Sequence, residues 1–328
     1  TKYFFDIPKE FQIVHASDEM HEIDMKYRFL RYEKVEVNLP TCDESYLAVC
    51  KHILDHGETR EDRTGTGTLS VFGQQMKFDL RTSIPLLTTK RVAWKSCIQE
   101  LLWFLRGDTN AKHLQQVGVS IWNGNSSKAF LNEVGLSHLE EGDCGANYSF
   151  QWRHFGGEYK DMDTHYSSKD GVDQIAYIEN LLKHDKHSRR IFLSAWNPCD
   201  LKKTVLPPCH VSAQFYVHNN DMLSCHMYQR SCDMFLGVPF NIFSYAVLTQ
   251  LLAVRNGFTP GFLTISTGDT HIYKNHVEQM ETQLKRLPRA TPMLKIQPSV
   301  NDKPFNEITL DDFELIGYFP QPALKGVM

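Results

Sequence analysis

The chain has 328 residues, of which 41% are hydrophobic and 23% charged, and its formal net charge is −4. This is enough material for a large core in one or two domains, and the negative balance argues against broad binding to a nucleic-acid backbone. The eight cysteines include no CxxC pair and no disulfide framework, which favours a reducing, cytoplasmic compartment, and no long uninterrupted apolar run predicts a membrane span.

The first 37 residues differ in pattern from the rest of the chain. Residues 11–14 and 25–32 predict two extended segments, with the polar run 17–22 as the turn between them. A two-stranded ribbon is marginal alone, so we expect it to join a sheet. A boundary near residues 38–40 then divides the chain into segments 1–37 and 38–328.

Hydrophobic periodicity and capping residues predict the elements of the larger segment. The predicted helices span 41–57, 92–105, 241–255 and 275–287, and the predicted strands span 69–80, 191–196, 211–217, 222–228 and 262–265. The first helix begins with a capping box of Thr41 and Glu44. The strand 69–80 changes phase near Gly73, where we expect a β-bulge. These elements predict an α+β fold with long buried helices packed on a large mixed or antiparallel sheet.

The candidate nucleophile is Cys209, which follows Pro207 and Pro208 and precedes His210. A lone cysteine is more often a small buried hydrophobe, but two prolines fix a rigid entry into the next strand. Nearby arginines would lower the pKa of the thiol and favour the reactive thiolate. His210 could share the pocket, and a cysteine hydrolase with an adjacent base remains an alternative on these residues alone.

Several arginines lie next to hydroxyl-bearing residues, which is typical of a phosphate site. Arg63 opens the run Arg-Thr-Gly-Thr-Gly-Thr, which is not a Walker motif because no Gly-Lys-Ser/Thr follows. Arg189 and Arg190 precede a predicted core strand, and Arg230 precedes Ser231. Each arginine alone is also compatible with an ordinary surface ion pair.

Four other polar residues could act on a small substrate. Glu100 lies in an apolar helix, and is either a structural ion-pair partner or a general acid/base with a raised pKa. Asn241 is either the N-cap of a buried helix or a bidentate amide that matches N3–H and O4 of uracil. His271 and Tyr273 alternate at a strand end and could bind a sugar hydroxyl. No His or Cys set has zinc spacing, so we expect no metal.

The ordered motifs that carry these residues resemble those of the thymidylate synthase family. The resemblance runs from about Pro40 to Tyr318 and rests on Arg63-Thr-Gly-Thr-Gly-Thr, Glu100-Leu-Leu-Trp-Phe-Leu, Gln151-Trp-Arg-His-Phe-Gly, Arg189-Arg190, Leu206-Pro-Pro-Cys209-His210, Gln229-Arg230-Ser231-Cys232-Asp233, Gly237-Val-Pro-Phe-Asn241 and His271-Ile-Tyr273. It implies reductive methylation of dUMP to dTMP by 5,10-methylenetetrahydrofolate, with release of dihydrofolate. The thiolate of Cys209 would add to C6 of the uracil.

The resemblance also implies a role for each candidate residue. Glu100 would relay protons through water, Tyr148 would assist proton removal at C5, and Asn241 would select uracil. The nucleotide would be held by Arg63, Arg189, Arg190, Gln229, Arg230, Ser231, Asp233, His271 and Tyr273, and the folate by Asp233, Trp122, Gly237 and Lys90. Because Arg189 and Arg190 would come from a second subunit, the resemblance implies a homodimer with shared active sites.

The N-terminal segment is similar to the final strand of a dihydrofolate reductase, through residues 25–34. This implies the synthase part of a bifunctional reductase–synthase, with an unrelated extension as the alternative. Three departures from the family pattern bear on turnover: Asn123 in place of Asp, Ser149 in place of Gly, and a shortened C-terminal tail. A deoxynucleotide hydroxymethylase, or a nucleotide- or RNA-binding regulator on the same scaffold, are the competing interpretations.

Overall fold

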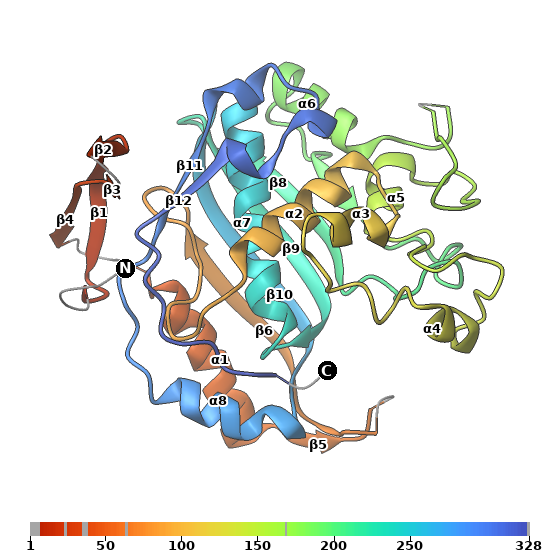
Figure 1. The fold of residues 1–328 in the computed structure, drawn as a ribbon, viewed down its shortest axis with the longest axis horizontal. Coiled ribbons are helices and arrows are strands. Elements are labelled where there is room, and N and C mark those ends of the chain that lie inside the picture. The colour runs from red at the N-terminus through yellow and green to blue at the C-terminus, as the bar shows by residue number, and fades with distance from the viewer. Residues whose placement is uncertain (1–6, 23–24, 35–38, 63–64, 168, 327–328) are drawn as a thin grey trace.

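The computed structural model describes residues 7–22, 25–34, 39–62, 65–167 and 169–326. Its centre is a six-stranded sheet in the order β5-β6-β10-β9-β8-β7 (Figure 1). These strands are β5 Glu58–Arg60, β6 Thr68–Asp79, β7 Phe192–Ser194, β8 His210–Val217, β9 Met222–Asp233 and β10 Thr259–Tyr273. β10 runs parallel to β9, and the other neighbours are antiparallel. The predicted α+β fold with a large mixed sheet is confirmed.

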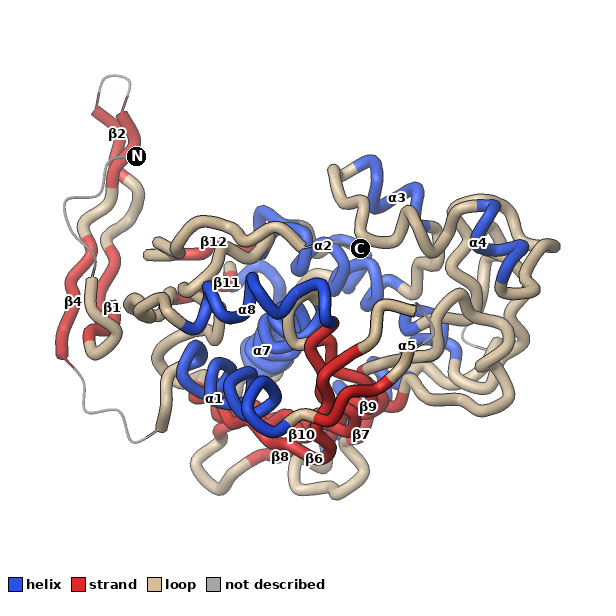
Figure 2. Tube along the Cα trace, turned by 90° about the horizontal axis from the view of Figure 1, so that it is seen from below, coloured by secondary structure: helices blue, strands red, loops and turns tan. Residues whose placement is uncertain are grey.

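Eight α-helices accompany the sheet in the described part of the chain. They are α1 Cys42–His56, α2 Trp94–Arg106, α3 Ala111–Gln116, α4 Lys128–Glu133, α5 Tyr148–His154, α6 Gln174–His184, α7 Gly237–Arg255 and α8 Val277–Leu284. Short 3₁₀ turns span Lys274–His276, Pro298–Asn301, Phe305–Glu307 and Leu310–Asp312, and β11 Met293–Ile296 pairs with β12 Phe313–Ile316. Figure 2 shows α1, α7 and α8 on the same side of the strands. That side holds the core.

Helix α7 is buried almost all round, because it packs on β9, β10 and α2. It begins at Gly237, four residues before the predicted start, with Pro239 in its first turn where no N–H is needed. Asn241 therefore lies inside the helix, and its interpretation as the N-cap is wrong. By length and composition α7 is the one helix of the described chain that could cross a membrane, but 78% of that window is buried within the protein.

The prediction is wrong about the extent of β10 and about the shape of β6. β10 has 15 residues, because its polar residues Ser266, Thr267 and Thr270 are paired between β6 and β9 instead of ending the strand. The predicted bulge near Gly73 is wrong: the β6–β10 register is the same on both sides of that residue. The buried side chains of β6 keep one phase throughout, and Leu69 only partly packs on the other side.

The N-terminal ribbon is a pair of short two-stranded sheets. β1 Phe11–Ala16 pairs with β4 Leu30–Lys34, and β2 Met20–Glu22 pairs with β3 Met25–Tyr27. The run predicted as a turn thus contains a strand. Within the described residues the ribbon joins no larger sheet, contrary to expectation, and Figures 1 and 2 show it beside the main body.

Side-chain contacts hold this ribbon against the body, which explains how it orders without a larger sheet. Ile13 is buried against Gly317, and Arg28 forms an ion pair with Glu314 on β12. The hydroxyl of Thr82 donates to Gln12. The division between residues 37 and 38 stays a prediction, because 35–38 lie outside the described residues.

Gly145 marks a close approach in the segment that leads into α5. Its φ is +66°, and a Cβ there would lie 2.1 Å from the carbonyl oxygen of Lys203. Only glycine fits both the left-handed backbone and the contact.

We expect Gly145→Ala to destabilise the fold more than Gly118→Ala does. Gly118 also has a positive φ, of +80°, but a Cβ there would meet nothing within 4 Å. Gly118→Ala should therefore cost only the backbone strain of about 1–2 kcal/mol. The clash at Gly145 should add about 1–3 kcal/mol in urea unfolding. Equal losses in the two variants would contradict this account.

Candidate active site

Cys209 lies half-buried immediately before β8, with its backbone fixed on both sides. Its N–H donates to the Tyr148 hydroxyl at 2.6 Å, and its carbonyl oxygen accepts from the Arg230 N–H at 2.8 Å. Burial raises the pKa of the Cys209 thiol, and the charge of Arg230 and hydrogen bonds from Tyr148 and Ser231 only partly oppose this. Arg230 thus lowers the pKa of this thiol as expected, but burial has the larger effect and the net shift is upward.

Two donor groups of the Arg230 side chain are engaged by backbone carbonyl groups near Cys209. Its Nε donates to the carbonyl of Pro208 at 2.8 Å, and its Nη2 donates to that of Pro207 at 2.9 Å. The guanidinium group also lies over the Trp196 ring, 5.3 Å from the centroid. Arg230 thus clamps the prolines that lead into Cys209.

His210 is buried, and its side chain contacts two tyrosines instead of acting as a base on the Cys209 thiol. Its Nδ1 lies 2.9 Å from the Tyr245 hydroxyl, and its ring stacks on Tyr148 at 3.9 Å. Burial lowers the pKa of His210 to about 3, so the ring is neutral near pH 7. This arrangement gives no support to a cysteine hydrolase that uses His210 as its base.

Glu100 and Trp122 form a hydrogen-bonded pair close to Tyr148. The Trp122 Nε1 donates to Glu100 at 2.7 Å, and its ring lies 6.4 Å from that of Tyr148. Burial raises the pKa of Glu100 to about 7, against the opposing effect of the Trp122 hydrogen bond. No ion pair of Glu100 occurs among the described residues, so the structural salt bridge is not found there. A carboxyl group with this pKa can hold or release a proton near neutral pH.

Asn241 meets Gln229 across the gap between α7 and β9. The Gln229 Nε2 donates to the Asn241 Oδ1 at 3.0 Å. Gln229 is buried, and its own Oε1 has no hydrogen-bond partner in the described part of the chain. This contact orients the Asn241 amide and leaves its NH2 group available to donate.

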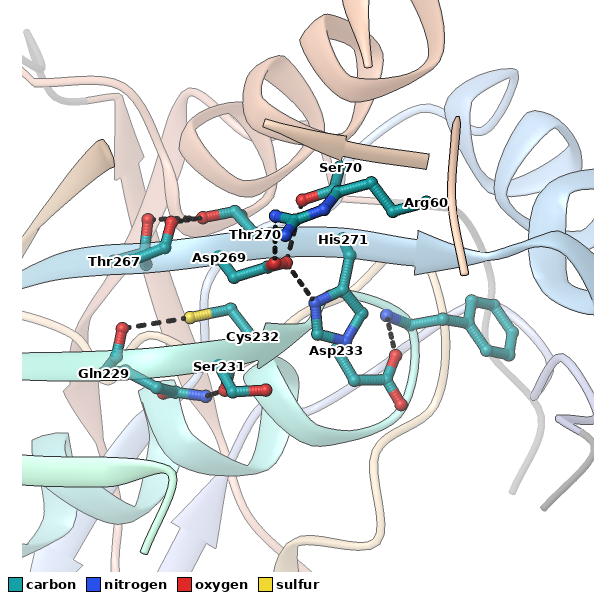
Figure 3. Close-up of polar contacts among 12 residues, drawn as sticks. Arg60, Ser70, Gln229, Ser231, Cys232, Asp233, Thr267, Asp269, Thr270 and His271 are labelled. Atoms are coloured by element: carbon teal, nitrogen blue, oxygen red, sulfur yellow. Dashed lines mark hydrogen bonds and ion pairs between the residues drawn. The ribbon is translucent and has the colours of Figure 1, made fainter. Parts of the chain in front are cut away.

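The ends of β9 and β10 line one cleft of about 270 Å³, part of which Figure 3 shows. Its lining consists of Arg60, Glu61, Asp62, Thr68, Arg230, Ser231, Asp269, His271 and Tyr273. The structure thus brings together four of the predicted substrate-binding residues. Arg63 lies outside the described residues. Sequence reasoning missed Arg60 and Asp269, although Asp269 lies two positions before His271 and so shares the alternation used for Tyr273.

Arg189 and Arg190 lie apart from this cleft within one chain. Both are exposed on the turn before β7, which is the sheet edge opposite to β5. Neither contributes to the lining of the cleft.

The three other residues predicted to bind folate meet at the turn between β9 and α7. The Asp233 Oδ1 accepts from the N–H groups of Phe235 and Leu236 at 2.9 and 3.1 Å. Gly237 starts α7 beside it, where a Cβ would lie 3.9 Å from that of Asp233. Lys90 is buried and donates to the Phe235 carbonyl, and burial lowers its pKa to about 8. Lys90 thus supports the turn, while its contact with the folate stays a prediction.

Ser149, one of the departures from the family pattern, lies in the first turn of α5. The Asn147 side chain caps α5 by accepting from the Ser149 N–H at 3.0 Å. The Ser149 hydroxyl is buried without a partner among the described residues. Within those residues, His, Cys, Asp and Glu form no group of three that could hold a metal ion.

Comparison with known proteins shows which family the chain belongs to. Residues 44–328 match the family model described as thymidylate synthase. The chain belongs to the thymidylate synthase family. It is 51% identical over 289 residues to thymidylate synthase of Homo sapiens, with 88% of this chain and 91% of that protein covered.

Bifunctional dihydrofolate reductase-thymidylate synthases are also similar to this family member. The protein of Zea mays is 53% identical over 283 residues, covering 86% of this chain and 54% of the relative. That of Paramecium tetraurelia is 48% identical over 314 residues, covering 94% and 67%. The chain spans about half the length of the plant relatives, at 54% and 49%.

We predict that Trp122→Phe raises the pKa of Glu100 further above its ordinary value. The substitution removes the N–H donor that favours the carboxylate, whereas the burial that disfavours it remains. Titration of the Glu100 carboxyl carbon by NMR measures the change. Trp94→Phe is the control, because Trp94 lies on the same helix as Glu100 and is not among the described donors to its carboxyl group. An unchanged or lowered pKa in Trp122→Phe would contradict the assigned cause.

Proposed function

We propose that this chain converts dUMP to dTMP, with 5,10-methylenetetrahydrofolate as cosubstrate and dihydrofolate as second product. The observation that carries the proposal is the position of Cys209. Its backbone is fixed by Tyr148 and Arg230, and Arg230 also lines the cleft with Ser231 and His271. Membership of the family supports the same activity.

The cleft supplies groups for each part of the nucleotide. Arg230 and Ser231 offer donors for the phosphate, and His271 with Tyr273 offers partners for the sugar hydroxyl. At the base, the Asn241 amide can donate to O4 and accept from N3–H of uracil. The contact from Gln229 favours that orientation.

In the proposed first step, the Cys209 sulfur forms a bond to C6 and the displaced electron pair moves toward C5 and O4. The raised pKa of Cys209 means that the thiol must lose its proton as the substrate binds. Arg230 and Tyr148 favour the thiolate at that moment, because both lower the pKa against the effect of burial. Glu100 can hold a proton for O4 through water, because its pKa is about 7. Later elimination restores the thiol.

The folate site is proposed from the turn that follows β9. Within the described chain only one Asp233 oxygen accepts hydrogen bonds, so the second remains available to a donor-rich ring. The Trp122 ring, which contacts Tyr148, offers a flat apolar surface beside the site. Methylenetetrahydrofolate would supply the one-carbon unit and the hydride.

We expect Cys209→Ala to abolish dihydrofolate formation, by on the order of 10⁴-fold or more, because the nucleophile is lost. Binding of dUMP should persist, since the phosphate, sugar and uracil contacts remain. The absorbance of dihydrofolate measures turnover, and calorimetry measures the binding of dUMP. Cys199→Ala is the matched control, because Cys199 is exposed. Full activity of Cys209→Ala, or a hydroxymethylated product from the unmodified chain, would contradict the proposal.

We further propose a homodimer in which Arg189 and Arg190 complete the phosphate site of the partner subunit. Three aromatic side chains support an interface on the open face of the sheet: Phe192, Tyr216 and Tyr228 are 44%, 63% and 40% exposed. Strand register places all three on one face. Exposed aromatic patches of this kind are typical of interfaces.

Mixing two impaired variants tests this shared site. Cys209→Ala and Arg189→Ala/Arg190→Ala should each be nearly inactive, whereas their unfolded and refolded mixture should regain about a quarter of the activity. Half of the dimers would be mixed, and each mixed dimer would keep one intact site. Cys209→Ala mixed with Glu100→Ala should regain none, because both residues belong to one chain's site. No recovery in the first mixture would contradict the shared site.

We also propose that residues 1–37 are the end of a dihydrofolate reductase domain. The similarity to the Paramecium tetraurelia bifunctional protein covers 94% of this chain, more than residues 38–328 can supply. The match therefore extends into the N-terminal ribbon.

A further inference from the structure

Asp269 on β10 joins three strands at the floor of the nucleotide cleft. Its Oδ1 lies 2.9 Å from Nδ1 of His271 and accepts from the Ser70 hydroxyl at 2.8 Å. Its Oδ2 accepts from Nη1 of Arg60 at 2.9 Å. Figure 3 shows the carboxylate between Arg60 and Ser70 on one side and His271 on the other. Both oxygens therefore have assigned partners.

We propose that Asp269 is a positioning residue for His271 and determines how the site recognises the sugar hydroxyl of the nucleotide. Ser70 and Arg60 hold the carboxylate, and the carboxylate holds the imidazole. The inference rests on the proposed function only in that it takes a deoxyribonucleotide as the ligand.

The direction of the hydrogen bonds follows from the chemistry of the carboxylate. An ionised carboxyl group can only accept, so Nδ1 of His271 must carry the proton of their contact. A neutral imidazole protonated at Nδ1 presents a lone pair at Nε2. That atom then accepts from a sugar hydroxyl. Without the carboxylate, the ring can rotate or exchange tautomers, and this acceptor is no longer fixed.

Arg60 provides the counter-charge of Asp269 in the cleft. A carboxylate in the lining repels an anionic nucleotide, and the Arg60 guanidinium offsets this charge. Arg60 is the last residue of β5, and Ser70 lies on the neighbouring β6. Three adjacent strands thus set the position of the ring.

Burial also restricts the position of the His271 ring. The imidazole side chain is only 9% exposed, whereas that of Asp269 is 36% exposed. The ring also meets Tyr273 edge-to-face, with centroids 5.2 Å apart. Its second face is thus restricted by packing, and the carboxylate fixes the remaining rotation.

The test compares the binding of dUMP with that of its 3′-deoxy analogue by calorimetry on the full chain. The unmodified protein should prefer dUMP by roughly 10-fold, the value of one net hydrogen bond. Asp269→Ala should weaken dUMP binding by about 10-fold or more and bring the preference close to one. Asp269→Asn should retain part of the preference, because its amide oxygen can still accept from Nδ1. The double variant Asp269→Ala/His271→Ala should show the same preference as His271→Ala alone.

Asp79→Asn is the matched control, because Asp79 is the last residue of β6, also pairs with an arginine, Arg81, and does not line the cleft. Its preference for dUMP should equal that of the unmodified protein. If Asp269→Ala weakens both nucleotides equally, the role is structural and the inference is overturned. If Asp269→Ala does not fold, Asp269→Asn and Ser70→Ala decide: an unchanged preference in both overturns it, and a reduced preference supports it.

A separate dTMP assay of the unmodified protein keeps this result apart from the proposed function. A hydroxyl preference that depends on Asp269 without dTMP formation supports the inference and contradicts the reaction. Formation of dTMP with a preference that is insensitive to Asp269 does the reverse.

Discussion

The parallel pairing of β9 with β10 is the constraint on which the site depends. Parallel strands that share a register end at the same edge of a sheet, and here Ser231 lies opposite Asp269 and Asp233 opposite His271. The strands need a crossover, which α7 supplies. Its first two turns carry Gly237 and Asn241 back over the end of β9. One β–α–β unit therefore brings together the residues of the turn and those proposed to bind the phosphate, the sugar and the base.

The sequence could predict most of this arrangement but not the geometry that joins it. The capping box at Thr41 and the strand β8 follow local rules, and the structure confirms both. The extent of β10 does not follow from alternation, because its polar residues satisfy their backbone through two neighbouring strands. Similarly, the sequence is compatible with Asn241 as an N-cap, whereas in the structure this residue lies within α7. Such contacts join residues that are distant in the sequence, and hydrophobic periodicity carries no information about them.

The reactivity of Cys209 could not be predicted from the sequence either, because it depends on opposing effects on the pKa of the thiol. The sequence places arginines near Cys209, and their charge does favour the thiolate. Burial disfavours the thiolate more, so the net effect is a raised pKa. The structure therefore describes a thiol with a fixed backbone and a raised pKa, and the proposed reaction requires that substrate binding favour the thiolate. Glu100, with a pKa of about 7, is the complementary group already poised to exchange protons.

The central claim is that Cys209 becomes covalently bound to the nucleotide, and peptide mass spectrometry tests it most directly. The protein would be mixed with dUMP and methylenetetrahydrofolate, quenched in acid during turnover, and digested. The account predicts that the peptide containing Cys209 gains the mass of the nucleotide, while the peptide with exposed Cys199 does not. Formation of dTMP with no such adduct, or with the adduct on another cysteine, would contradict the account.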